Sequence, residues 1–231
     1  MSQKLSPPAD SERVTVSFRV PEGVTLLPLE GGYVSDKCTN KYFNSNMQPY
    51  EVGANSWVSL PFVRSIEDDL WNVSIAKEGG GRCQWKLRSI FVSFCLSDSV
   101  ALVKGRKTIP SSYLFDFIGV TSANTYSVGS AQDFKGDLSL ETDFFPIVAE
   151  LSDKETGVRL FGGDTNSYKW SRHFRLNGTK NIFIKPILHL SKSVIVTQSD
   201  KLSEFTAEYP DGSRENIPYI FPDYDKLLSM K

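Results

Sequence analysis

The sequence has little histidine, little cysteine and no long hydrophobic run. Its 231 residues include two histidines and three cysteines, and no apolar segment approaches the roughly 20 residues that a membrane-spanning helix needs. The 26 basic residues nearly balance the 27 acidic ones, which gives a formal net charge of −1. Because no long basic run is present, a nucleic-acid partner is not expected on electrostatic grounds.

The common catalytic and metal-binding motifs are also missing. The chain has no Gly-x-Ser-x-Gly turn, no His-Glu-x-x-His helix and no Cys-x-x-Cys pair. His173 and His189 lie in strand-like stretches, where we expect packed or surface side chains rather than a catalytic base. Asp68 and Asp69 are adjacent, so on a strand they would point to opposite faces, which does not suit paired acid–base chemistry. We therefore expect no catalytic residues, no metal and no cofactor.

What the sequence does contain is a series of short stretches rich in β-branched and aromatic residues, which favours β-sheet. The longest such stretch runs from residue 83 to residue 96. Its apolar residues fall on odd positions up to Leu87 and on even positions from Ile90 onward. A strand changes phase in this way at a β-bulge, which we place near Arg88 and Ser89. The alternative is that the second half of the strand is buried on both faces.

These patterns predict an all-β fold, an elaborated antiparallel β-sandwich with Ig-like or transthyretin-like layers, over residues 13–231. Residues 1–12 are rich in serine, proline and charge, which is typical of a flexible tether. Residues 121–137 are rich in serine, threonine, glycine and asparagine, and they mark the one candidate boundary between two lobes.

Turn signals predict three hairpins. These pair residues 71–77 with 83–90, residues 172–176 with 181–184, and residues 203–209 with 214–217. The second has the strongest signal, because Asn177-Gly178 is the favoured sequence for a type I′ turn.

Strand length decides which of the three cysteines can pair. If residues 83–95 form one strand, its ends lie about 40 Å apart at ~3.3 Å per residue, whereas bonded cysteines need Cα atoms about 4.4–6.8 Å apart. Cys83 and Cys95 are then excluded as partners. We predict a structural disulfide between Cys38 and Cys83, with Cys95 a buried free thiol. The alternative is three reduced cysteines in a cytosolic protein.

The start of the chain, Met1 to Glu12, has no apolar segment and is therefore not a signal peptide. One interpretation is a cytosolic protein with a ragged end. The other is a mature exported protein whose signal has been removed, with Met1 in place of the native residue. The predicted disulfide favours the exported protein.

Residues 36–55 have no clear alternation and are rich in asparagine, so we expect a long loop. Loops of this length are uncommon in compact domains and are often functional. Tyr42, Phe43 and Tyr50 lie in it. They either form a contact surface for a partner or hold the loop on the core.

The acidic turn at residues 67–69 offers a second candidate contact surface, through Asp68 and Asp69. The alternative is that it is an ordinary solvated turn.

One stretch resembles a known family. Gly81-Arg-Cys-Gln-Trp-Lys-Leu-Arg-Ser-Ile90, with Cys38 upstream, is similar to the lipase-immunity (Tli-like) group of periplasmic lipoproteins that act as type VI secretion immunity proteins. The Cys-x-Trp-Lys-Leu core is its specific part, and residues 33–97 contain most of the similarity. The chain differs from that group in having no lipobox cysteine.

The resemblance implies a lipid-anchored outer-membrane protein that faces the periplasm and blocks an incoming secreted phospholipase by covering its active-site cleft. It supplies no catalytic residues. The rival hypothesis is a carbohydrate-binding β-sandwich module, in which exposed aromatic side chains stack on sugar rings. Ordered aromatics in a shallow groove would favour the glycan, and a convex aromatic patch would favour a protein partner.

Overall fold

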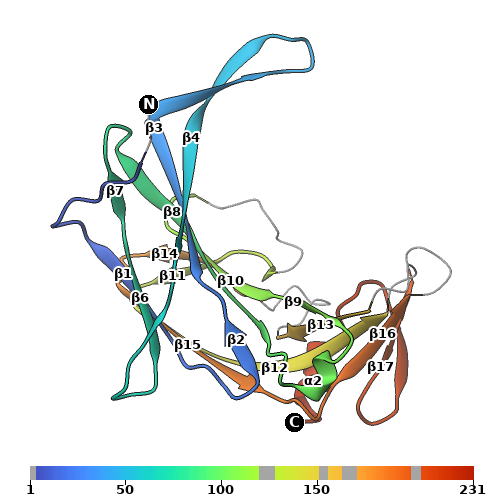
Figure 1. Ribbon diagram of the computed structural model, residues 1–231. Coiled ribbons are helices and arrows are strands. Elements are labelled where there is room, and N and C mark those ends of the chain that lie inside the picture. Colours follow the sequence, from blue (N-terminus) through green and yellow to red (C-terminus); the bar gives the residue numbers. More distant parts are fainter. Residues whose placement is uncertain (1–3, 120–127, 151–155, 163–170, 199–203) are drawn as a thin grey trace.

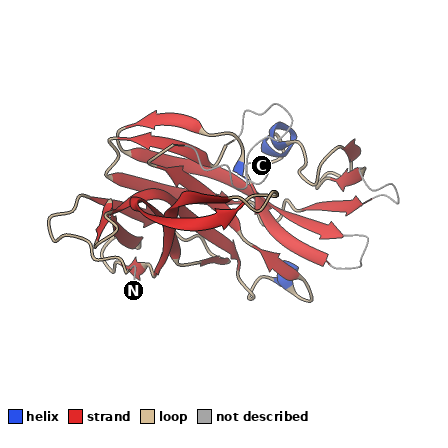
Figure 2. Ribbon diagram, turned by 90° about the horizontal axis from the view of Figure 1, so that it is seen from above, coloured by secondary structure: helices blue, strands red, loops and turns tan. Residues whose placement is uncertain are grey.

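The computed structural model describes residues 4–119, 128–150, 156–162, 171–198 and 204–231. Two β-sheets pack against each other, and a long two-stranded hairpin extends beyond them (Figure 1). Strands dominate the described residues, and helix is confined to short segments (Figure 2). The predicted all-β sandwich is therefore confirmed.

The first sheet has ten strands. Eight follow the order β18 (Arg214–Ile217), β17 (Phe205–Glu208), β16 (Val194–Gln198), β12 (Leu138–Glu150), β15 (Asn181–Leu188), β1 (Arg13–Phe18), β6 (Trp71–Ala76) and β5 (Val63–Arg64). Two more extend it beside β12, namely β13 (Thr156–Phe161) and β9 (Lys107–Ile109).

The second sheet has eight strands. Six follow the order β11 (Gln132–Lys135), β14 (His173–Asn177), β10 (Ser111–Asp116), β8 (Trp85–Leu96), β3 (Leu29–Phe43) and β4 (Pro49–Leu60). The other two pair with the ends of β8 and are β2 (Val24–Leu26) and β7 (Glu78–Gly80). The helical elements that lie wholly within the described residues are a 3-10 turn, Ala101–Val103, and α2, Tyr224–Leu228.

The two sheets meet in an aromatic core. In β1 the alternate residues Val14, Val16 and Phe18 are fully buried, as a strand with one inward face requires. The Phe18 ring lies 5.4 Å from that of Phe94 in the opposite sheet, and Phe94 packs edge-on against Phe144 at 5.1 Å. Such pairs add to the free energy of burial and join the layers.

A second buried cluster lies between the far end of the first sheet and the C-terminal helix. Its centre is Phe161, whose ring stacks on Phe221 at 5.2 Å. Asp223 begins α2 by accepting a hydrogen bond from the Lys226 amide, a common N-cap arrangement. Leu227 is fully buried in the same cluster.

The central strand β8 confirms the predicted change of phase. Gly32 pairs with Ser89 and Tyr33 pairs with Leu87, which leaves Arg88 as the extra residue of a bulge. The strand begins at Trp85, not at the predicted Cys83. Residues 81–84 form a turn instead, in which Gln84 has a positive φ of 48°.

Both sheets are mixed, whereas the sequence predicted antiparallel layers. β1 and β12 each run parallel to β15, and β14 runs parallel to β10 and β11. The reason is that the chain often crosses to the other sheet between consecutive strands, so strands that become neighbours are distant in sequence.

The same crossings make two of the three predicted hairpins wrong. β6 pairs with β1 in the first sheet and β8 belongs to the second, because the chain changes sheets near Lys77. Of the predicted pairing only its end is present, where the Leu87 amide donates a hydrogen bond to the Lys77 carbonyl oxygen and β7 pairs with β8. Asn177-Gly178 likewise connects β14 in the second sheet to β15 in the first. Gly178 has a φ of 70° but Asn177 has no positive φ, so the turn is not type I′. The third predicted hairpin, β17 with β18, is confirmed.

The described part of the N-terminal segment lies along the body of the protein. The Ser6 amide donates a 2.8 Å hydrogen bond to the carbonyl oxygen of Gly79. Glu12 forms a 3.2 Å ion pair with Lys77. Of the predicted lobe boundary, residues 121–127 lie outside the described residues and β11 occupies part of the remainder.

Candidate functional site

The feature that stands out from the sandwich is an arm formed by residues 36–55. Beyond Val34, β3 pairs only with β4, and the two strands continue together to the pair Phe43 and Pro49. Figure 1 shows this hairpin extending away from both sheets. The expectation of a loop at residues 36–55 is therefore wrong. Main-chain pairing makes the segment a β-hairpin, although its side chains show no simple alternation.

The turn at the tip of the arm is stabilised by Asn44. The amide of Asn44 bonds to the carbonyl oxygen of Gln48 at 3.0 Å. Its side-chain oxygen accepts hydrogen bonds from the amides of Asn46 and Gln48. Met47 adopts a φ of 58°. Asparagine side chains favour such turns because they replace a backbone hydrogen bond.

One face of the arm is aromatic and apolar. Tyr42 lies directly opposite Tyr50, with ring centroids 5.9 Å apart, and Asn40 lies opposite Val52. The other face carries the ion pair of Lys41 with Glu51, which also accepts a hydrogen bond from Thr39. Phe43 and Pro49 lie on the same face as this ion pair, so the arm carries exposed apolar side chains on both faces, and nothing described covers them.

The tip is still more exposed. Phe43 has 62% of its surface exposed and Met47 has 77%. Six of the thirteen exposed large hydrophobic residues of the described chain lie on β3, β4 or the turn between them. These six are Tyr42, Phe43, Met47, Tyr50, Val52 and Trp57. Tyr42, Tyr50 and Val52 share one face of the hairpin, and clustered apolar exposure of this kind marks interaction sites.

The aromatic face continues the inner face of the second sheet. On β4, even-numbered side chains point inward: Ala54 is fully buried, and Val58 and Leu60 pack on the core. Tyr50 and Val52 belong to the same row, because alternate residues of a strand share a face. The arm thus extends a core-facing surface past the end of the opposite sheet.

The base of the arm is fastened to the body at one place. Cys38 forms a disulfide with Cys83, with Cα atoms 5.2 Å apart, which confirms the predicted pairing. Ser35 accepts hydrogen bonds from the amides of Lys37 and Cys38. The pairing of β3 with β4 shifts register between Ser35 and Thr39, so the residues beside the disulfide form an irregularity in the strand.

The acidic turn lies away from the arm. Asp69 pairs with Arg64 at 2.6 Å, and Asp68 accepts a hydrogen bond from the amide of Leu70. A hydrogen bond from Ser65 holds the pKa of Asp68 below its usual range. In Figure 1 this turn, just before β6, lies at the opposite end of the molecule from the tip of the arm. The structure therefore does not bring the two predicted contact surfaces together.

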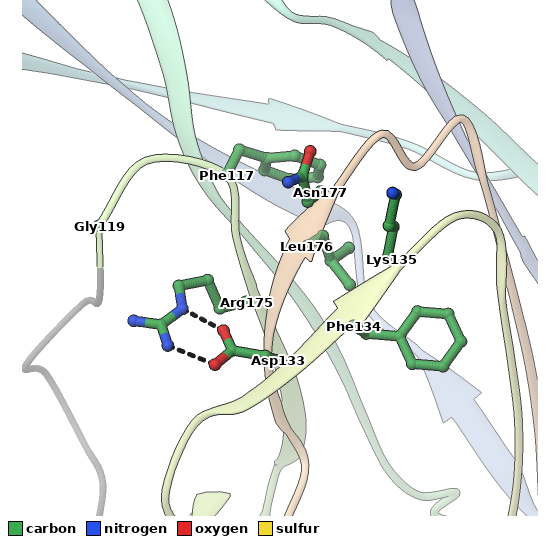
Figure 3. A pocket seen from close by; sticks show the side chains of 8 residues that line it. All are labelled: Phe117, Gly119, Asp133, Phe134, Lys135, Arg175, Leu176 and Asn177. Carbon is green, nitrogen blue, oxygen red and sulfur yellow. Dashed lines mark hydrogen bonds and ion pairs between the residues drawn. The ribbon is translucent and has the colours of Figure 1, made fainter.

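A shallow pocket lies at the other edge of the second sheet, between β11 and β14 (Figure 3). Arg175 forms two hydrogen bonds with Asp133 there, one of 2.6 Å, and these lower the pKa of the carboxyl group. Because the two charges satisfy each other, the pocket offers less to an ionic ligand than its composition suggests. Its one exposed aromatic ring is that of Phe134.

Both histidines are paired with aspartates. His173 is fully buried and its Nε2 lies 2.7 Å from the carboxylate of Asp116, which is also fully buried. His189 lies 2.6 Å from Asp143 and stacks on the ring of Phe145. The sequence predicted packed or surface histidines, but it gave no indication of these aspartate partners, which are distant along the chain.

Other kinds of site are not evident in the described residues. They contain no group of three or more histidine, cysteine, aspartate or glutamate side chains placed to hold a metal ion. They also contain no helix of the length and hydrophobicity needed to span a bilayer. Comparison of the chain with protein-family models, curated proteins and solved structures gives no match. The function must therefore be argued from the arm.

Proposed function

We propose that this protein is a binding protein without chemistry of its own, which docks on a protein partner through the arm. The observation that supports this most is the exposed apolar face of Tyr42, Tyr50 and Val52 on a protruding hairpin. Tyrosine and other aromatic residues dominate the binding energy of protein interfaces, often by about 2 kcal/mol or more each. The same residues would be costly to keep exposed without a partner.

A protein partner suits the arm better than a glycan. Sugar-binding aromatics form a platform in a shallow groove, whereas these side chains stand on a hairpin that projects from the sandwich (Figure 1). Between Ala54 and Pro49 the arm projects roughly 17 Å at ~3.3 Å per residue. That length and an apolar face suit insertion into a cleft.

The partner that we propose is a secreted phospholipase, with this protein as its immunity protein. The sequence resemblance around Cys83 and Trp85 suggests that partner. The shape of the arm is compatible with it, since the active-site cleft of a lipase must admit acyl chains and is therefore apolar. An inhibitor of this kind needs only a rigid, complementary surface, because pre-organisation limits the entropy lost on binding.

We also propose that the protein works in the periplasm, attached to the outer membrane by a lipid. The disulfide between Cys38 and Cys83 supports an oxidising compartment. Cys38 and Cys83 are bonded to each other and Cys95 lies inside β8, so the lipid in this proposal is attached to a cysteine other than these three.

The test is phospholipase hydrolysis of lipid at increasing amounts of this protein, with the candidate lipase encoded beside it. We expect stoichiometric inhibition by the wild type. Tyr50→Ala should weaken inhibition at least tenfold. Tyr219→Ala is the matched control, since Tyr219 is exposed to a similar extent but lies between β18 and α2. Undiminished hydrolysis at saturating protein would refute the proposal, and selective retention on a glycan column would support the rival.

A further inference from the structure

The strand β4 forms the end of the second sheet, and no described strand pairs with its outer edge. It is twelve residues long. The strands at the other three ends of the two strand orders, β5, β11 and β18, have two, four and four residues. A long edge is unusual because unpaired amides and carbonyls invite pairing with another chain.

This edge also lacks the features that normally block pairing. Native edge strands are usually protected by lysine, proline or other charged side chains. β11 and β18 carry charges of both signs. In β4 the only charged residue is Glu51 and the only proline is Pro49, at its first position. The stretch from Val52 to Leu60 has neither.

The direction of the free backbone groups follows from the tip of the arm. The hydrogen bond from the Asn44 amide to the Gln48 carbonyl makes these two residues a hydrogen-bonded pair. Backbone groups alternate along a strand, so the even-numbered residues of β4 bond to β3. The odd-numbered residues direct their amides and carbonyls away from β3, toward the open edge of the sheet. The residues that direct an amide toward this edge, with which no described strand pairs, are Glu51, Gly53, Asn55, Trp57 and Ser59.

The side chains beside this edge define what kind of strand could join it. On the face of β4 that continues the core side, the side chains are apolar or aromatic except for one serine; they are Tyr50, Val52, Ala54, Ser56, Val58 and Leu60. On the opposite face of β4 the side chains of Glu51, Asn55 and Ser59 are polar and that of Trp57 is apolar. A strand that joins the edge continues both rows, so it needs apolar residues at alternate positions and polar residues between them.

From these observations we infer that β4 is a strand-addition site, at which an extended, alternating apolar and polar strand of the protein partner extends the second sheet. The main-chain hydrogen bonds supply affinity, and the row that begins at Tyr50 and Val52 supplies selectivity. The inference rests on the proposed function only in naming a protein partner, and it specifies how that partner binds.

Hydrogen exchange of individual amides, measured by NMR, tests the mode of binding. In the free protein the amides of Gly53, Asn55 and Trp57 should exchange quickly, and those of Val52 and Ala54 slowly, because only the latter bond to β3. Binding of the lipase should slow hydrogen exchange of the edge-facing amides of Gly53, Asn55 and Trp57 at least tenfold. The amides of Val52 and Ala54, which bond to β3, serve as an internal control for a general decrease in exchange across the protein.

A proline substitution provides the matched variant. Asn55→Pro removes an outward amide that β3 does not use, and proline is tolerated at such edge positions. Asn55→Thr changes the side chain and keeps the amide. We expect Asn55→Pro to weaken lipase binding at least tenfold and Asn55→Thr to leave it nearly unchanged. Slow exchange at Val52 and Ala54 shows that the proline variant folds; if it does not, Ser59→Pro replaces it.

A second probe separates this inference from the identity of the partner. It is a short synthetic peptide in which threonine and valine alternate between terminal lysines, added at millimolar concentration. If the peptide slows exchange of the edge-facing amides and this protection is lost in Asn55→Pro, strand addition is supported even if the lipase does not bind. A lipase complex with unprotected outward amides overturns strand addition and leaves the proposed inhibition standing. If the lipase does not bind and the peptide gives no protection, both are overturned.

Discussion

The hydroxyl of Ser35 donates a 2.6 Å hydrogen bond to the carbonyl oxygen of Cys83. Ser35 is buried, and it lies just beyond the last residue of β3 that pairs with β8, Val34. The disulfide from Cys38 reaches the same residue, Cys83. A single turn of the body thus holds the arm by one covalent bond and one buried hydrogen bond.

The first prediction concerns the cysteines. Peptide mapping without reductant should find Cys38 joined to Cys83. Cys95 is free but only partly buried, so the prediction of a buried thiol is wrong: its side chain lies on the less buried face of β8. Partial burial still raises the pKa of its thiol, so it should react more slowly than an exposed cysteine. The bond closes a loop across a sequence separation of 45, which corresponds to about 4 kcal/mol in the chain-entropy description. Cys83→Ala should therefore lower the melting temperature clearly. Rapid labelling of all three thiols in the native protein would contradict the pairing.

The second prediction compares two neighbours on β8. Trp85 is 1% exposed, so Trp85→Ala should reduce the free energy of unfolding by about 3–5 kcal/mol. Lys86 points outward and approaches Asp36 only at 3.8 Å, an exposed pair of little energetic value. Lys86→Ala should change the free energy of unfolding very little. Chemical denaturation of the two variants checks this, and equal effects would mean that the inward face has been assigned to the wrong residues.

The strands could be predicted from the sequence where packing against the opposite sheet imposes an alternation of buried and exposed side chains. On β8 the core buries alternate side chains, so Trp85 and Ile90 reveal both the strand and its bulge. The arm has no opposite sheet to impose an alternation. The pattern around Tyr42 and Tyr50 therefore predicted a loop, and only their aromatic chemistry marked them as candidate contact residues.

The hairpin predictions show a second limit. A turn signal such as Asn177-Gly178 reports local backbone geometry and does not determine which sheet the next strand joins. That choice depends on long-range packing, here of Ile182 and Ile184 in the core between the sheets. The pairing of His173 with Asp116 was invisible for the same reason, because the two residues are 57 positions apart.

The third prediction concerns acid stability. Burial alone would raise the pKa of Asp143, but hydrogen bonds from His189 and Lys231 lower it overall. A depressed pKa in the folded protein stabilises it above the unfolded pKa of about 3.9, and the stabilisation is lost as the pH falls through the folded value. Asp143→Asn should therefore cost about 1 kcal/mol at pH 7, since the group lies near solvent.

The measurement is denaturation of wild type and Asp143→Asn across the acid range. The difference between them should shrink below about pH 4 and vanish once the wild-type carboxylate is protonated. A difference that is independent of pH would mean that Asp143 acts through its shape and neutral hydrogen bonds, and not through its charge.

The fourth prediction uses the distance between the arm and the acidic turn. If the arm makes the contact, Asp68→Lys and Asp69→Lys should leave the dissociation rate of the complex unchanged. A change of charge outside the contact should alter only the association rate and its dependence on salt. Stopped-flow binding at two salt concentrations distinguishes these. Faster dissociation of either variant would place the acidic turn inside the interface.

The last prediction tests whether the disulfide aims the arm. In a Cys38→Ser, Cys83→Ser double variant the core residues that join the sheets are unchanged, so the sandwich should remain folded, although less stable. The arm would lose its covalent attachment and sample other orientations. If the competent orientation is then populated about one-tenth of the time, the affinity for the partner should fall about tenfold. Cys95→Ser, which leaves the disulfide intact, is the control.

NMR relaxation of the arm amides should report the added motion while the amides of β8 stay rigid. A mobile arm with unchanged affinity would show that the partner orders the arm by itself, and a rigid arm would assign the anchoring to the hydrogen bond from Ser35.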